Sequence, residues 1–341
     1  MTSHTSLFGL FGLSGLFLLA IGTGTACGPL TPEELAGDPQ ATSQELILKE
    51  TCRGAPYPIV LAHGMAGWEK VGPVNYFFNI ASDLRARGET VFESQVPPFE
   101  SSAVRGGYLA AAIDDALKTT GACKVNLIAH SQGGLDGRYV ISTLHYGSRV
   151  ASLTTVSTPH LGTPIADAAL GLVPGVTAEV IDAIIGFLYG SLAHAPGDAH
   201  IRASLQQFTR DNMRRNFNPS NPNDPQVKYY SVAGRSAARI AAAECAGGLW
   251  SNSTRIDFLD PILVLPATVF SLTSPNPLSP TPNDGLVSVD SARWGTFLGC
   301  YPADHLDEIG QLLHLLPDAI SGFNHKELYR RILDQLHRDG L

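Results

Sequence analysis

Two patterns of apolar and polar residues alternate along this chain of 341 residues, one typical of strands and one typical of helices. Compact apolar runs, which predict buried strands, lie at 57–62, 90–95, 124–129, 150–156 and 228–232. Between them, segments with apolar residues at helical spacing lie at 75–87, 107–119 and 132–146. Strands that alternate with helices predict a mostly parallel sheet with helices on both faces. The pattern therefore predicts a fold of the α/β class.

The first 50 residues differ from the rest of the chain. An uncharged apolar run at 7–21 is followed by Gly24-Thr25-Ala26-Cys27, which predicts an export signal over 1–26, because the run is too short for a membrane span. Either cleavage after Ala26 releases a secreted protein, or Cys27 is lipidated and anchors an outer-membrane or cell-surface lipoprotein. Residues 27–50 predict a tether, and residues 51–341 the folded domain.

The amino-acid composition and the net charge restrict the class of protein. With 44% hydrophobic residues and 16% charged residues, the chain can bury a large core. The net charge of -8 and the absence of any Lys/Arg-rich run argue against a nucleic-acid partner.

Four further cysteines, an even number, permit disulfides in a chain predicted to be exported. We expect Cys52 to pair with Cys123, because each precedes a strand that should run parallel and adjacent to the other. Cys245 with Cys300 then follows by elimination.

The strand at 124–129 ends at a serine flanked by small residues. The segment Ala129-His130-Ser131-Gln132-Gly133 is close to the pattern G-x-S-x-G, with Ala129 in place of the first glycine. In that pattern a strand, a tight turn and a helix expose a nucleophilic serine. We therefore predict Ser131 as a nucleophile; the alternative is a chance strand-turn-helix.

A serine hydroxyl needs a histidine base and a carboxylate that orients this histidine. In enzymes with this kind of turn, the acid and then the histidine follow the serine along the chain. His305 lies in a loop between a strand-like segment and a helix, and is the predicted base. Asp284 lies in an Asn-Asp-Gly turn upstream and is the predicted acid.

An oxyanion that forms during ester cleavage needs preorganised N–H donors. The backbone of Gln132, directly after the serine, is one predicted donor. The other is the backbone of Met65, in the His63-Gly64-Met65 loop after the first strand.

Two helix-like segments, at 166–170 and 176–188, follow the strand at 150–156 and are separated by Pro174 and Gly175. Their insertion after a strand of the sheet, between hinge residues, favours a mobile lid at about 165–205 over ordinary core helices.

Five segments together, in the same order, resemble the bacterial true lipases of the Pseudomonas and Burkholderia type: 57–64, 124–134, 157–162, 283–288 and 305–308. The resemblance implies an α/β-hydrolase fold with a helical lid, hydrolysis of triacylglycerol, and the roles given above for the serine, acid, base and oxyanion donors.

The same resemblance implies a structural Ca²⁺ bound by Asp260 and Asp307 and by the backbone carbonyls of Gln311 and Leu315. Alternatively, Asp307 only caps a helix. Position 290 is Asp, where these lipases carry a disulfide cysteine, so any disulfides of this chain must differ from theirs. The resemblance therefore does not imply that this chain needs the foldase chaperone of many of these lipases.

The sequence thus predicts a serine ester hydrolase that acts on water-insoluble acyl esters at an interface, most simply a triacylglycerol lipase. A carboxylesterase or phospholipase on the same scaffold is one alternative. A non-catalytic lipid-binding envelope lipoprotein is another. Membrane association would follow from lipidation of Cys27 or from the lid.

Overall fold

The computed structural model describes residues 52–67, 70–71, 74–190, 198–236, 248–250, 255, 257–277, 280–311 and 321–341. Residues Thr51–Leu341 form one compact unit. Among the described residues, no helix combines the length and apolarity that crossing a membrane requires. The predicted signal, the tether, Cys27, Cys245 and Leu315 lie outside the described residues.

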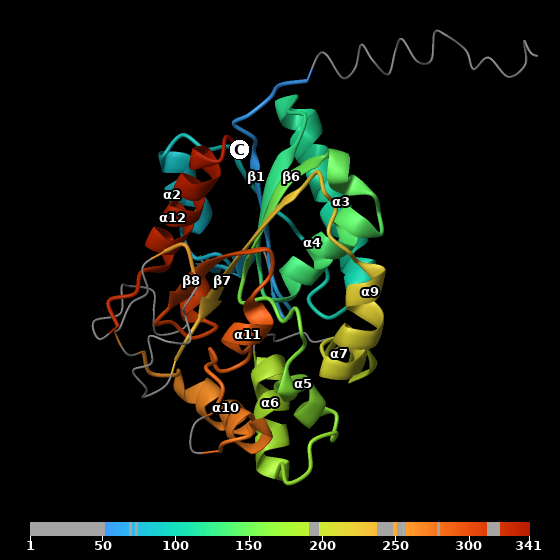
Figure 1. The fold of residues 1–341 in the computed structure, drawn as a ribbon, viewed down its shortest axis with the longest axis vertical. Coiled ribbons are helices and arrows are strands. Elements are labelled where there is room, and N and C mark those ends of the chain that lie inside the picture. Colours follow the sequence, from blue (N-terminus) through green and yellow to red (C-terminus); the bar gives the residue numbers. More distant parts are fainter. Residues whose placement is uncertain are drawn as a thin grey trace, which may run out of the picture. The chain divides into compact units, whose positions relative to one another are not determined.

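A six-stranded parallel sheet runs through the centre in the order β4-β1-β5-β6-β7-β8 (Figure 1). The strands are β1 (Ile59–Ala62), β4 (Val91–Glu93), β5 (Val125–His130), β6 (Val150–Val156), β7 (Lys228–Gly234) and β8 (Thr296–Tyr301). Each of the five predicted strands is present within a few residues of its expected bounds, and the predicted α/β-hydrolase sheet is confirmed.

Alternation along β1 explains why helices cover both faces. Ile59 and Leu61 pack with α2 (Ile80–Ala86) and α12 (His325–Arg338) on one face. Val60 and Ala62 pack with α3 (Ser102–Thr120) and α4 (Gln132–Ser142) on the other (Figure 1). Because a strand that is apolar on both faces must be covered twice, this run dictates a three-layer core.

Four helices form a third apolar cluster beyond the carboxyl ends of the strands (Figure 1). They are α5 (Pro164–Ala169), α6 (Ala178–Gly190), α7 (Asp198–Gln207) and α10 (Pro261–Thr273). The helices expected at 166–170 and 176–188 correspond to α5 and α6. Helix α10 was not predicted from the sequence.

Short elements complete the fold: β2 (Lys70–Val71), β3 (Val74–Asn75), η1 (Tyr146–Ser148), α8 (Arg210–Asn212), η2 (Met213–Phe217), α9 (Asn218–Ser220), α11 (Val289–Ala292) and η4 (Asp307–Ile309).

The predicted disulfide Cys52–Cys123 is present, with Cα atoms 5.0 Å apart. A parallel bridge between Arg53 and Ala122 brings the two cysteines together, as expected for segments that lead into neighbouring strands. Cys300 is also disulfide-bonded.

Candidate active site

Ser131 lies at the sharp turn between β5 and α4. Its φ of 54° and ψ of -126° are unusual for a residue other than glycine, as expected where a strand is forced directly into a helix. A Cβ at Gly133 would lie 2.3 Å from the carbonyl oxygen of Ala62, so only glycine fits after the turn. Ala129 lies within strand β5 and pairs with Ala62 of β1.

His305 and Asp284 form a buried pair. The distance between His305 Nδ1 and Asp284 Oδ2 is 2.7 Å, and the His305 backbone N–H donates to the Asp284 carbonyl at 2.9 Å. The other carboxylate oxygen accepts from the backbone N–H groups of Leu286 and Val287, at 2.9 and 2.7 Å. These bonds fix the carboxylate, which in turn fixes the ring.

The loop after β1 lies against the serine. A Cβ at Gly64 would come within 2.8 Å of Ser131 Cβ, so glycine permits this close approach. The Arg105 guanidinium donates to the carbonyls of His63 and Gly64, at 2.7 and 3.2 Å. A buried ion pair with Asp136 at 2.8 Å holds Arg105 in place. Arg105 thereby fixes the backbone of the loop that carries Met65.

A cavity of about 400 Å³ opens beside these residues. Ser131, His305 and Met65 line it, so the structure brings the predicted nucleophile, base and one oxyanion donor to a single space. The rest of the wall is mainly apolar and comes from the helical cluster, including Ile165, Ala166, Ile184, Phe187, Leu205 and Ile262. Such a wall suits an acyl chain and offers little to a polar ligand.

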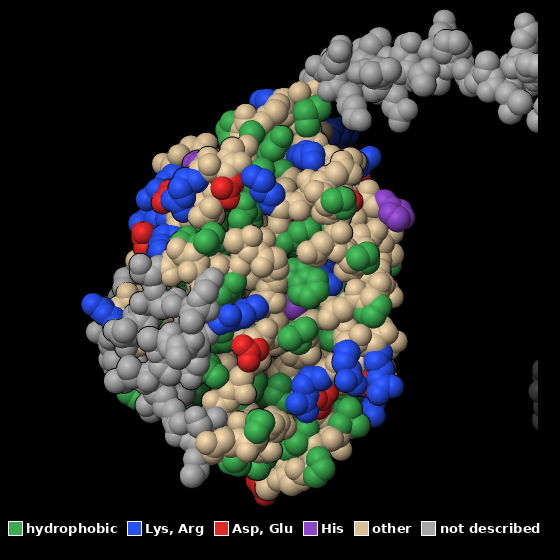
Figure 2. All heavy atoms as spheres, in the orientation of Figure 1, with side chains coloured by type: hydrophobic (Ala, Val, Ile, Leu, Met, Phe, Trp, Pro, Cys, Tyr) green, Lys and Arg blue, Asp and Glu red, His purple; other side chains and the backbone are tan. Residues whose placement is uncertain are grey.

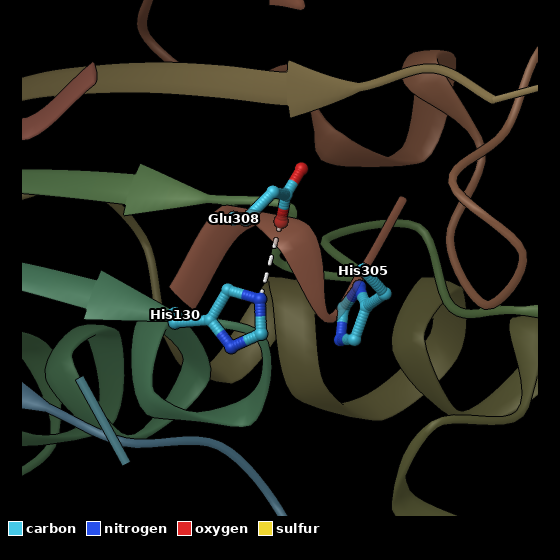
Figure 3. A group of neighbouring side chains, drawn as sticks. All are labelled: His130, His305 and Glu308. Atoms are coloured by element: carbon cyan, nitrogen blue, oxygen red, sulfur yellow. Dashed lines mark hydrogen bonds and ion pairs between the residues drawn. The ribbon is translucent and has the colours of Figure 1, made fainter. Parts of the chain in front are cut away.

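A buried polar network connects the carboxyl ends of three strands next to Ser131, and Figure 3 shows its pair of His130 and Glu308. The Tyr76 hydroxyl lies 2.7 Å from His130 Nδ1, and His130 Nε2 lies 3.1 Å from Glu308 Oε2. The Ser157 hydroxyl donates to the other oxygen of Glu308 at 2.5 Å and accepts from the Gly234 N–H at 3.0 Å. Glu308, on η4, thus links the carboxyl ends of β5, β6 and β7.

Burial keeps this network uncharged. It raises the pKa of Glu308 well above its usual range, and the nearby Asp284 carboxylate raises it further. It lowers the pKa of His130 well below its usual range, with an added effect of His305. A neutral Glu308 has one O–H. Because its other oxygen accepts from Ser157, we assign this O–H to donate to His130 Nε2, so that His130 Nδ1–H donates to the Tyr76 hydroxyl oxygen.

Three buried carboxylates, from Asp257, Asp304 and Asp307, place oxygens within 4.8 Å of one another. Burial and the negative charges of Asp304, Asp257 and then Asp260 raise the pKa of Asp307 to about 10. Asp260 adjoins the group through its backbone N–H, which donates to Asp304 Oδ2 at 2.8 Å. An all-oxygen donor set with this much negative charge is suited to a hard cation.

Of the predicted calcium ligands, the structure thus brings Asp307 into the carboxylate group and places Asp260 beside it. The side-chain amide of Gln311 donates to the backbone carbonyls of Asn75 and Tyr76, at 2.8 Å each.

Sequence reasoning missed Asp257 and Asp304 as members of the carboxylate group, and His130, Glu308 and Arg105 as supports of the site. His130 and Glu308 stand inside motifs that were recognised, but nothing local shows that they meet. The only available signal was their position next to Ser131 and within His305-Leu306-Asp307-Glu308.

Comparisons with known proteins identify the family of this chain. A sequence model described as the alpha/beta hydrolase fold matches residues 57–196. A triacylglycerol lipase of Vibrio cholerae is 32% identical over 315 residues, which cover 88% of this chain and 94% of that protein. A triacylglycerol lipase of Burkholderia plantarii is 40% identical over 125 residues, so the match spans 36% of this chain and 34% of that lipase.

Solved structures show the same fold. Staphylococcus hyicus lipase aligns with a TM-score of 0.56 at 19% identity, covering 85% of this chain and 97% of that one. The mature form of a Bacillus licheniformis lipase aligns with a TM-score of 0.54 at 18% identity, covering 82% and 94%.

Proposed function

This chain belongs to the triacylglycerol lipases of the α/β-hydrolase fold, and on that premise we propose that Ser131, His305 and Asp284 hydrolyse acyl esters through an acyl-enzyme. The observation that carries the assignment is the pair of His305 and Asp284 at the wall of a cavity that Ser131 also lines. The three residues follow in the chain order of this fold.

In the first half of the reaction, Ser131 Oγ attacks the ester carbonyl carbon while His305 Nε2 takes the hydroxyl proton. Asp284 stabilises the resulting imidazolium. The backbone N–H groups of Met65 and Gln132 donate to the oxyanion, and each such donor contributes about 3–4 kcal/mol to the transition state. His305 then gives its proton to the departing alcohol.

In the second half, water attacks the acyl-enzyme carbonyl. His305 takes a proton from the water and returns it to Ser131 Oγ, which releases the carboxylic acid.

Labelling with a fluorophosphonate tests this assignment. We expect wild-type protein and Ser82→Ala, at an exposed serine on α2, to be labelled, and Ser131→Ala to be neither labelled nor active on p-nitrophenyl esters. Full activity of Ser131→Ala would exclude the mechanism. An unlabelled wild-type protein would instead favour the non-catalytic lipid-binding alternative.

For the substrate, the apolar cavity supports a long acyl chain and hence triacylglycerol. A rate on emulsified long-chain triacylglycerol that exceeds the rate on dissolved short esters is the expected result. A preference for dissolved short esters would favour a carboxylesterase, and a preference for phospholipid dispersions would favour a phospholipase.

We also propose that α5 and α6 move as a lid over the cavity.

We further propose that Asp257, Asp304 and Asp307 hold a structural Ca²⁺, with Asp260 beside them. Because Asp304 and Asp307 flank His305 in the chain, the ion would brace the loop that carries the base. Calcium binding by calorimetry after chelator treatment tests this. Asp307→Asn should weaken binding strongly, whereas Asp182→Asn, at an exposed position of α6, should leave it unchanged.

Export over residues 1–26 remains a proposal, with either a free or a lipidated Cys27. Mass spectrometry of the mature chain distinguishes these, because a diacylglyceryl group and an N-acyl chain add a defined mass to Cys27. Purification of active protein without a coexpressed chaperone would show independence from a foldase.

A further inference from the structure

Two groups of metal-ligating side chains meet on the segment that follows β8. Asp304 and Asp307 belong to the carboxylate group described above, whereas His305 and Glu308 lie beside His130, at the end of β5 (Figure 3). His130, His305 and Glu308 each offer one ligand atom, and the three atoms lie within 4.8 Å of one another. We call these three buried side chains the His-His-Glu group.

The donor atoms of the His-His-Glu group differ from those of the carboxylate group. Imidazole nitrogens suit Zn²⁺ and its neighbours among the transition metals, whereas carboxylates alone suit Ca²⁺. Two histidines and one glutamate with an open fourth position form a donor set that binds Zn²⁺ in proteins. His130 Nε2 and Glu308 Oε2 are 3.1 Å apart. Two ligands at about 2.0 Å from a tetrahedral ion lie about 3.3 Å apart, so this pair already has a suitable spacing.

Hydrogen bonds on the far side of both rings orient them for a metal. His305 Nδ1 lies 2.7 Å from Asp284 Oδ2, and His130 Nδ1–H donates to the Tyr76 hydroxyl oxygen at 2.7 Å. Histidines that bind a metal usually donate their other ring N–H in this way, which fixes the tautomer and the ring. In both rings Nε2 is therefore the nitrogen that carries the lone pair.

Charge and access also suit a divalent cation in the His-His-Glu group. Binding would replace the proton of Glu308, which passes to water. The carboxylates of Glu308 and Asp284 would then together offset the two positive charges of the ion. His130 and His305 both line the cavity, which gives an ion a path to them.

We propose that the His-His-Glu group binds Zn²⁺ reversibly and that the bound ion inhibits hydrolysis. The inhibition rests on the proposed function of His305 as the base, whereas the binding of the ion does not. With its lone pair on the ion, His305 Nε2 can no longer take the proton of Ser131. The segment 304–308 would thus hold two ions with opposite effects, since Ca²⁺ at the carboxylate group braces the loop and Zn²⁺ at the His-His-Glu group blocks the base.

Binding is measured with Co²⁺, a coloured substitute for Zn²⁺, on protein saturated with Ca²⁺ so that the carboxylate group is filled. The variant is Glu308→Gln, which removes the charged ligand. The matched control is Glu89→Gln, which changes the pair of Glu89 with His337 at 3.2 Å. Figure 2 shows charged side chains of both signs over α2 and α12, where this surface pair lies.

Hydrolysis of dissolved p-nitrophenyl acetate is measured in parallel, with and without Zn²⁺, relative to the metal-free rate of each protein. We expect Zn²⁺ to inhibit wild type and Glu89→Gln at least about tenfold. Glu308→Gln should need at least about tenfold more Zn²⁺ for the same inhibition, because one ligand and one charge are lost. Visible absorption of bound Co²⁺ should appear in wild type and control, disappear on addition of Zn²⁺, and be absent from Glu308→Gln.

Equal inhibition of the three proteins by Zn²⁺ would overturn the proposal, and so would Co²⁺ absorption that persists in Glu308→Gln. Loss of the absorption in Glu89→Gln would overturn it too, because the ion would then sit on the surface. If Glu308→Gln fails to fold, His130→Gln takes its place in the Co²⁺ measurement. Co²⁺ absorption that depends on Glu308, in a protein that never cleaves the ester, would contradict the proposed function and leave the metal site supported.

Discussion

The ring of His130, the residue directly before Ser131, packs against the ring of His305 with the two ring centroids 4.5 Å apart. His130 ends the central strand β5, whereas His305 lies in the loop that follows β8, much later in the chain; Figure 3 shows the two rings beside each other. The nucleophile's neighbour thus contacts the base directly, and Glu308 holds that neighbour in place.

Replacement of Glu308 by Leu should lower the free energy of unfolding by about 2–4 kcal/mol, because the buried polar groups of His130 and Ser157 lose their partner. It should also lower kcat more than it changes KM, since the reacting groups shift. Glu308→Gln retains an acceptor and a donor and should recover most of both. Urea denaturation and initial rates measure these effects. Equal losses in both variants would show that hydrogen bonding is not the cause.

Asp284→Asn should lower kcat by about 10³- to 10⁴-fold with little loss of stability. The amide group can no longer hold the His305 ring in the tautomer that leaves Nε2 free to accept a proton. Initial rates on p-nitrophenyl butyrate, with circular dichroism as the folding control, check this. A loss of less than tenfold would assign the acid to another residue.

Arg105→Ala should destabilise the protein by about 3–5 kcal/mol, because Asp136 would remain buried without its cation. It should also reduce kcat, since the carbonyls of His63 and Gly64 lose their donor. The control is Arg149→Ala, which breaks a half-exposed pair with Asp114 and should cost less than about 1 kcal/mol. If urea denaturation gave the same loss of unfolding free energy for Arg105→Ala and Arg149→Ala, the role of Arg105 in holding the loop would be contradicted.

His63 should make the protein acid-sensitive. Burial, and then the charge of Arg105, lowers its pKa to about 3. The unfolded chain, with a pKa of about 6.5, therefore binds a proton that the folded chain rejects, so stability is full above pH 6.5 and falls as the pH falls toward 3.

Between pH 7 and pH 5, His63 should lower the free energy of unfolding by about 2 kcal/mol. In urea denaturation at both pH values, His63→Gln should show a correspondingly smaller loss than wild type. His145→Gln, at an exposed position, should keep the wild-type loss. Identical pH dependence in wild type and His63→Gln would contradict this assignment.

The local sequence pattern predicted the strands because each lies in a short, mostly apolar run that alternates with segments of helical spacing. It also anticipated the pair of Cys52 and Cys123, whose positions before two strands required only that these strands be neighbours. Helix α10 was not predicted, because its apolar residues do not gather on one face and because it contains Pro266. A helix is recognised in sequence by contrast between two faces, and α10 has none.

The sequence by itself determined the parallel sheet and the candidates Ser131, Asp284 and His305, since a strand, a turn and chain order are local or one-dimensional properties. Only the tertiary structure decided that His130 meets His305, that Arg105 clamps the loop before Met65, and that Asp257 and Asp304 join Asp307. These contacts join residues distant in sequence, and packing of the whole chain brings them together.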